Sequence, residues 1–164
     1  MESFIAARDK ARKKAGVADH ILTQTYPLVK DPKLLIAVLQ NLYDAVGFGI
    51  EALLEYEGSL DRLPTIPDTP DARLAMFQQH LSQRYKLPAE FLGFVGDLRE
   101  TLKEHRESPV EFVRKEEFVI CDEGYRIRKL SKEQLKQYLL KTKAFLGFME
   151  EKVNRNDAII AQRG

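Results

Sequence analysis

The stretch from Asp31 to Glu57 constrains the fold more than any other part of the chain. It opens with Asp31-Pro32, a capping residue followed by a proline at the first helical position, where proline fits without losing a needed hydrogen bond. Apolar residues then recur at three- and four-residue steps, which places them on one side of an α-helix. They are Leu34, Leu35, Val38, Leu39, Leu42, Ala45, Val46, Gly49, Ile50 and Leu53. Further apolar residues leave only a narrow polar row, so we predict a central helix covered by several neighbours.

Length and composition indicate a single globular domain. The chain has 164 residues, of which 44% are apolar and 31% charged, enough to bury a core and too apolar for a disordered chain. We predict that residues 1–154 form one helical-bundle domain and residues 155–164 a polar C-terminal tail. Because 26 Lys and Arg residues balance 25 Asp and Glu residues, the strongly basic footprint of a dedicated nucleic-acid coat is excluded.

Helical periodicity on both sides of the central helix predicts the helices that cover it. They span about residues 2–25, 69–84, 88–106 and 131–154. The first is expected to end at Tyr26-Pro27, because a residue before proline is pushed out of the helical region. Ala45 and Gly49 lie one turn apart on the apolar side of the central helix. We therefore expect Gly49 at a close helix crossing.

After the helix at residues 88–106 the pattern changes. The segment Ser108-Pro109-Val110-Glu111 is a capping box with proline at the first helical position, which predicts a short helix. The run from Phe118 to Cys121 predicts a strand, and the run from Tyr125 to Arg128 the returning strand, with a glycine of positive φ in the turn between them. The predicted fold class is all-α: an antiparallel four- to five-helix bundle with one inserted β-hairpin at about residues 117–129.

The sequence has no pattern typical of a metal or cofactor site. The three histidines have no second ligand-type residue at the i+3 or i+4 step, so we predict no metal and no cofactor. Cys121 is the single cysteine and cannot form an intramolecular disulfide, which favours a reducing, cytoplasmic location. Polar residues interrupt the longest apolar segment, so we expect no membrane span.

The first predicted helix carries a run of basic side chains on its outer face. Arg8, Arg12, Lys13 and Lys14 belong to this run. One interpretation is contact with RNA phosphates or acidic lipid, and the other, which we favour, is a solvated helix face.

The segment from Arg99 to His105 joins an arginine to a histidine across five residues. This spacing resembles the Arg-x(4–6)-His motif of HEPN domains, which are small helical bundles, often intracellular and dimeric, many of them metal-independent ribonucleases. The resemblance covers roughly residues 1–106 and implies a homodimer that binds or cleaves RNA, with Arg99 and His105 as catalytic residues. Histidine moves a proton near neutral pH, and arginine stabilises the charge on a transferring phosphate.

Helical geometry separates these two residues. Six positions apart, Arg99 and His105 lie about 120° apart around a helix, so a shared site needs a break in the helix or a second subunit. The residue after the arginine is commonly Asn or another polar amide in the family, and here it is Glu100.

Two further segments, residues 25–35 and 108–121, resemble segments of uncharacterised small archaeal proteins, a resemblance that implies no activity. The alternative to an RNA-directed function is a non-enzymatic helical protein–protein interaction module, whose exposed aromatic residues or unpaired hairpin edge bind another protein. The sequence leaves both functions open, and with them the question whether the chain is an enzyme.

Overall fold

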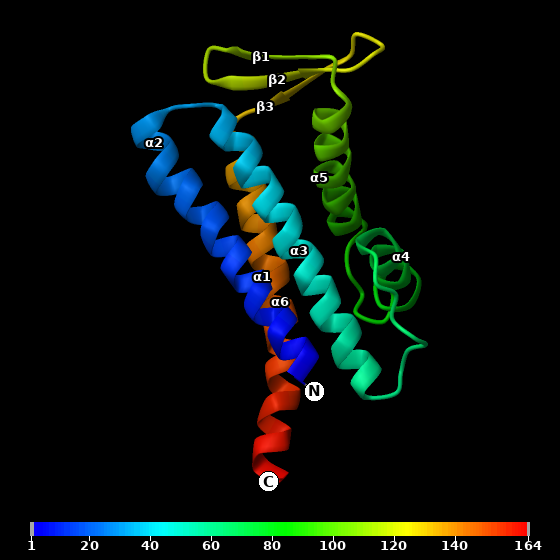
Figure 1. Ribbon diagram of the computed structural model, residues 1–164. Coiled ribbons are helices and arrows are strands. Elements are labelled where there is room, and N and C mark those ends of the chain that lie inside the picture. The colour runs from blue at the N-terminus through cyan, green and yellow to red at the C-terminus, as the bar shows by residue number, and fades with distance from the viewer. Residues whose placement is uncertain (1, 164) are drawn as a thin grey trace.

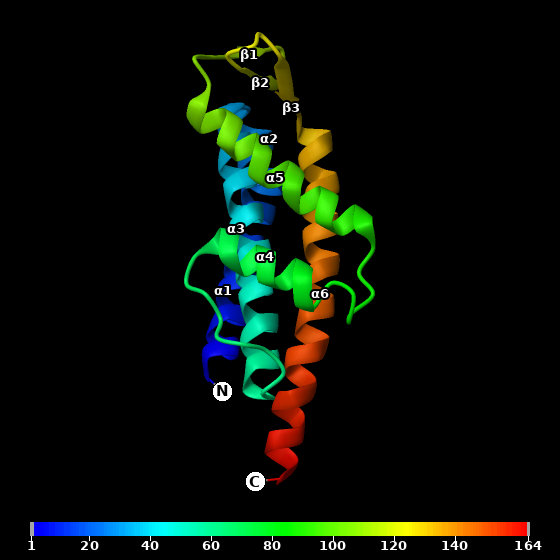
Figure 2. The same ribbon diagram turned by 90° about the vertical axis from the view of Figure 1, so that its right-hand side faces the viewer.

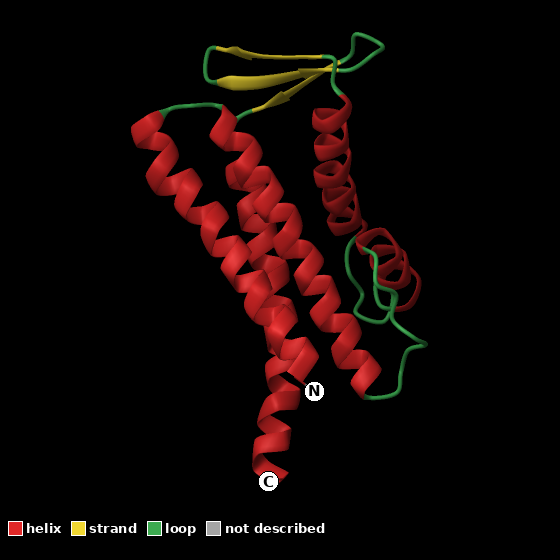
Figure 3. Ribbon diagram, viewed as in Figure 1, coloured by secondary structure: helices red, strands yellow, loops and turns green. Residues whose placement is uncertain are grey.

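The computed structural model describes the backbone of residues 2–163 and the side chains of residues 3–154. Most of this chain is helical, and a small antiparallel sheet lies at one end of the helical body (Figures 1 and 3). The mostly helical character predicted from the sequence is confirmed. In chain order the elements are α1 (Glu2–His20), a π-helix (Ile21–Thr25), α2 (Tyr26–Val29), α3 (Lys33–Ser59), α4 (Pro70–His80), α5 (Ala89–Glu107), β1 (Val110–Arg114), β2 (Glu117–Cys121), β3 (Ile127–Leu130) and α6 (Lys132–Arg163).

The central helix is α3, as its apolar spacing predicts. Its inner residues, among them Leu35, Leu39, Leu42 and Leu53, have no exposed surface. The helices α1 and α6 pack against α3 and against each other, while α4 and α5 contact α3 from another side (Figures 1 and 2). By length and composition α3 is apolar enough to cross a membrane, a criterion that a buried core helix also meets.

Gly49 lies at a close crossing of α3 and α6, which confirms the expectation from its spacing. A Cβ atom at this position would lie 2.9 Å from Cε2 of Phe145 and 3.0 Å from Cδ2 of Leu146. Both distances are shorter than ordinary van der Waals contact, so a side chain at this position would force Phe145 and Leu146 to shift.

The prediction that Tyr26-Pro27 ends the first helix is wrong, because the chain stays helical to Val29. The N–H of Tyr26 bonds the carbonyl oxygen of Ile21, five residues back, in the π-helix that precedes the proline. This wider turn shifts the hydrogen-bond pattern just where Pro27 would clash with a regular α-helix. The helix ends at Lys30, which has a φ of 56° and donates its N–H to Tyr26 O at 2.7 Å.

The last helix begins as its capping box predicts. Oγ of Ser131 accepts the backbone N–H of Gln134 at 3.2 Å, which satisfies one free donor of the first turn. The helix continues to Arg163, through most of the predicted polar tail at residues 155–164. The side chains of residues 155–163 lie outside the described part.

The single predicted hairpin is instead part of a three-stranded antiparallel sheet in the order β1-β2-β3. The strands β2 and β3 correspond to the predicted hairpin, with Phe118 opposite Leu130 and Cys121 opposite Ile127. The sheet spans residues 110–130, not 117–129, because β1 adds to the other side of β2.

The short helix predicted at Ser108-Pro109 is therefore wrong, since the residues after it form β1. The hydroxyl of Ser108 lies 2.7 Å from the carbonyl oxygens of both Val110 and Cys121, so it ties the start of β1 to the end of β2. The run of β-branched and aromatic residues in β1 fits a pleated strand better than a helix. The segment forms a strand and not a helix because β2 supplies its hydrogen-bonding partners.

The loop between β2 and β3 also differs from the predicted turn. The positive φ falls on Tyr125, at 62°, and not on Gly124. Oδ1 of Asp122 accepts the N–H groups of Gly124, at 2.9 Å, and Arg126, at 2.8 Å. The hydrogen bond from the Arg126 N–H, with the nearby Arg126 charge, lowers the pKa of Asp122 below its ordinary value. Asp122, and not the glycine, organises this loop.

Candidate functional site

The C-terminal end of α5 is fastened to the sheet by two neighbouring residues. Nδ1 of His105 lies 2.9 Å from Oε1 and 3.0 Å from Oε2 of Glu111 in β1. Nε of Arg128 in β3 donates to Oε2 of Glu104 at 2.5 Å, and its Nη2 donates to Oε1 at 3.3 Å. This bidentate hydrogen bond raises the pKa of Arg128 above its ordinary value. We call these four residues the α5–sheet clamp.

The strand register explains why both clamp residues of the sheet point to the same helix. Glu111 and Arg128 both stand opposite Ile120 of β2, so the three side chains form one row across the sheet. Ile120 is 1% exposed and belongs to the hydrophobic core. The row therefore lies on the inner face, with an apolar centre and a polar contact to α5 at each end.

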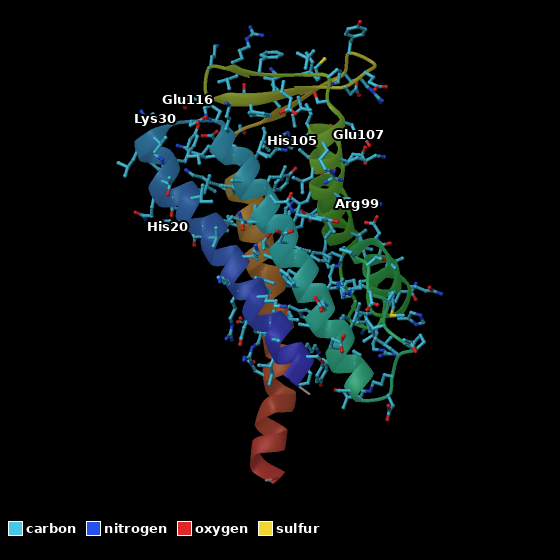
Figure 4. All side chains as sticks on the ribbon, in the orientation of Figure 1. His20, Lys30, Arg99, His105, Glu107 and Glu116 are labelled. Atoms are coloured by element: carbon cyan, nitrogen blue, oxygen red, sulfur yellow. The ribbon has the colours of Figure 1, made fainter. Side chains whose placement is uncertain are left out.

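His105 is thus placed at an interface between elements, and Arg99 lies apart from it. Nε of Arg99 lies 3.1 Å from Oδ1 of Asp71 in the first turn of α4, and the two side chains are 52% and 66% exposed. Figure 4 shows His105 near the sheet and Arg99 farther down α5, on another side of the helix. Since α5 is continuous from residue 89 to residue 107, one chain does not direct both side chains to one point.

The basic run of α1 mostly contacts neighbouring helices. Three of its four candidate RNA-binding side chains have partners on α6 or α3. The pairs are Arg8 Nη1 with Asn154 Oδ1 at 2.6 Å, Arg12 with Glu150, and Lys14 Nζ with Asp44 Oδ2 at 3.9 Å. The hydrogen bond to Glu150 raises the pKa of Arg12 above its ordinary value. Lys13 is exposed. These contacts join α1 to its neighbours and leave a reduced basic surface.

The outer face of the sheet carries exposed apolar side chains. Alternation along the strands places Val110 and Phe112 of β1 on this face, together with Ile127 of β3, and they are 53%, 44% and 60% exposed. Between them lies Val119 of β2, which is 2% exposed. We call these four residues the outer apolar face. The opposite side, with Ile120, packs on the helices, so the sheet is apolar on both faces.

The strand β1 also has a free edge. It pairs with β2 on one side, and within the described part of the chain no strand pairs with its other side. Backbone N–H and C=O groups along such an edge are available to another strand. The strand β1 is not predicted from the sequence, because residues 108–111 match the pattern of a helix start. The alternation of apolar and charged residues from Val110 to Phe112, within a run of β-branched and aromatic residues, is the sequence signal for this strand.

Among the described side chains, no group of three or more His, Cys, Asp or Glu residues is arranged to hold a metal ion. No protein-family model, curated protein or solved structure matches this chain.

Proposed function

We propose that this chain is a non-enzymatic protein–protein interaction module that binds an extended peptide strand along β1. One observation carries the proposal: the free edge of β1 borders an outer face on which Val110, Phe112 and Ile127 are exposed. An added strand would form backbone hydrogen bonds with β1 and place every second side chain beside this face. The partner is thus a segment with apolar residues at alternating positions.

The attachment of the sheet supports this role. The α5–sheet clamp holds β1 and β3 from the inner side. Tyr26 in α2 contributes a further contact, because its hydroxyl lies 3.4 Å from the carbonyl oxygen of Glu116 in the β1–β2 turn. Because β1 is already ordered before a partner binds, it loses little conformational entropy on binding, which favours affinity.

The proposal is tested by selecting extended peptides from a random displayed library on the intact protein. We expect enriched peptides to alternate apolar and polar residues, and Phe112→Asp to weaken their binding about tenfold by titration calorimetry. Leu60→Asp is the matched control, since Leu60 is 36% exposed just after α3, at the end of the molecule opposite the sheet (Figure 1). Equal loss of affinity in both variants, or peptides without alternation, would contradict binding along β1.

A second candidate function is metal-independent RNA cleavage at His105. It is supported by the carboxylate of Glu111, which orients Nδ1 of the imidazole as an acidic partner orients a histidine general base. Because Arg99 points elsewhere in one chain, this function requires a homodimer that brings in Arg99 from a second copy.

This second candidate is tested by incubating the protein with single-stranded RNA in EDTA. It predicts cleavage by the parent chain and at least a hundredfold loss in His105→Ala. Arg106→Ala removes a neighbouring cation from the same helix and serves as the control. Absence of cleavage in the parent, with a lowered melting temperature in His105→Ala, would leave His105 with its clamp role alone.

A further inference from the structure

The C-terminal end of α3 lies remote from the sheet (Figure 1). There the segment after α3 and the connection between α4 and α5 both contact a buried carboxylate. Glu57 is 2% exposed. Its Oε1 accepts the hydroxyl of Tyr85 at 2.6 Å, and its Oε2 accepts Nη1 of Arg84 at 3.1 Å and Nη1 of Arg62 at 3.4 Å. Arg62 follows α3, whereas Arg84 and Tyr85 lie between α4 and α5.

This arrangement fixes the two guanidinium groups beside each other. A buried carboxylate without partners would be strongly destabilising, so Glu57 requires the donors that surround it. Burial first, and then the hydrogen bond to Glu57, raises the pKa of Tyr85 above its ordinary value, so its hydroxyl stays protonated and donates. Both arginines reach the same oxygen, which makes their Nη1 atoms near neighbours.

A third cation completes the group. Nζ of Lys152 in α6 lies 5.6 Å from the ring centre of Tyr85 and 5.5 Å from that of Phe148. Lys152, Arg62 and Arg84 line one open pocket of about 280 Å³ together with Glu57 and two tyrosines. Three cations against one carboxylate leave two positive charges in excess among the residues that line it.

The guanidinium groups of Arg62 and Arg84 have more N–H donors than the bonds to Glu57 use. A guanidinium group has five N–H donors, and the bond to Glu57 uses one nitrogen of each arginine. The side chains of Arg62 and Arg84 are 55% and 42% exposed, so their remaining donors are open to solvent at the pocket. Glu57 therefore acts as a positioning residue that holds two guanidinium groups at the pocket, each with further N–H donors directed to solvent.

We propose that this pocket binds the phosphate group of inorganic phosphate or of a phosphate monoester, through Arg62, Arg84 and Lys152. A phosphate monoester carries a charge of about −1.5 to −2 at pH 7, which matches the excess positive charge. Its oxygens accept the paired N–H groups of guanidinium with good geometry, and the lysine adds a point charge. This site is separate from the proposed strand-docking edge and does not depend on it.

The test is a calorimetric titration of the intact protein with sodium phosphate and with phenyl phosphate, each against sodium chloride at equal ionic strength. We expect saturable binding of phosphate that Lys152→Gln weakens about tenfold, because one charge-assisted contact is lost. This substitution is informative because Lys152 makes no hydrogen bond to Glu57 among the described contacts, so the buried carboxylate keeps its partners. Arg62→Gln should weaken binding similarly.

Lys136→Gln is the matched control, since it removes the same charge from an exposed position near the other end of α6. It should leave phosphate affinity unchanged. Tighter binding of phenyl phosphate than of phosphate would identify a monoester as the ligand class, and equal binding would identify the free ion. No saturable binding by the parent protein, or equal weakening by Lys136→Gln and Lys152→Gln, would overturn the proposal.

Discussion

Two glycines of α3, two residues apart, differ in what surrounds them. A Cβ at Gly49 would lie 2.9 Å from Phe145, whereas a Cβ at Gly47 would meet nothing within 4 Å. We expect Gly49→Leu to lower the free energy of unfolding by about 1–3 kcal/mol through overpacking against α6. Gly47→Ala should instead raise it by up to about 1 kcal/mol, because alanine favours the helix. Urea unfolding of both variants measures the difference, and an unchanged midpoint for Gly49→Leu would indicate a looser crossing.

Asp122 provides a prediction about pH. Its pKa in the folded chain is lowered from the ordinary 3.8, chiefly by the hydrogen bond from the Arg126 N–H. A lowered pKa means that the carboxylate stabilises the β2–β3 loop at pH values above 3.8 and loses this effect as the pH falls through the folded pKa. We expect the Arg126 amide resonance to titrate in this acidic range, and Asp122→Asn to abolish that titration. A titration that persists in Asp122→Asn would assign it to another group.

At the scale of elements, the α5–sheet clamp predicts a measurable coupling. Glu104 and Arg128 share two hydrogen bonds and are 23% and 29% exposed. In a double-mutant cycle with Glu104→Gln and Arg128→Gln, we expect a coupling energy of about 1 kcal/mol by chemical denaturation. The same cycle on the more exposed pair of Arg99 and Asp71 should give a smaller value. A larger coupling there would show that α4 and not the sheet holds α5.

The elements that the sequence predicts well are those with local causes. The apolar steps of α3 and the capping box at Ser131 depend on neighbours in the chain, and both appear in the structure. The segment Ser108 to Glu111 satisfies the same local rule for a helix start, yet it becomes a strand because β2, downstream in the chain, supplies its hydrogen bonds. A single sequence does not show which of two competing arrangements gains such a partner.

The same limit applies to the candidate sites. Helical geometry correctly separates Arg99 from His105, because both lie on one continuous helix. The partner of His105 is Glu111, which reaches it only after β1 folds back, and the partner of Arg12 is Glu150 on the last helix. From the sequence alone, the basic run of the first helix is expected to form an open surface. In the fold, three of its four candidate RNA-binding side chains contact residues of other helices.

At the scale of the whole molecule, the three features described above lie in different places. The free edge of β1 is at one end, the pocket lined by Glu57 is near the C-terminal end of α3, and the α5–sheet clamp joins the sheet to the helices (Figure 1). The long helices α1, α3 and α6 share the most continuous packing. The unit formed by α5 and the sheet has a buried inner side, but all of β1 except Glu111 is exposed.

Because β1 is largely exposed whereas α1, α3 and α6 pack against one another, we expect α5 and the sheet to open at a lower free energy than these three helices. Native-state hydrogen exchange should show the amides of β1, β2, β3 and α5 exchanging as one group, ahead of those buried in α1 and α3. Ile120→Ala removes the apolar side chain between Glu111 and Arg128. It should lower the opening free energy of the α5 and sheet amides by about 2–4 kcal/mol. Leu39→Ala in α3 is the control, and it should lower protection throughout. If Ile120→Ala instead accelerated exchange equally in α1, the sheet would open only with the whole molecule, and the free edge of β1 would be as stable as the helical core that supports it.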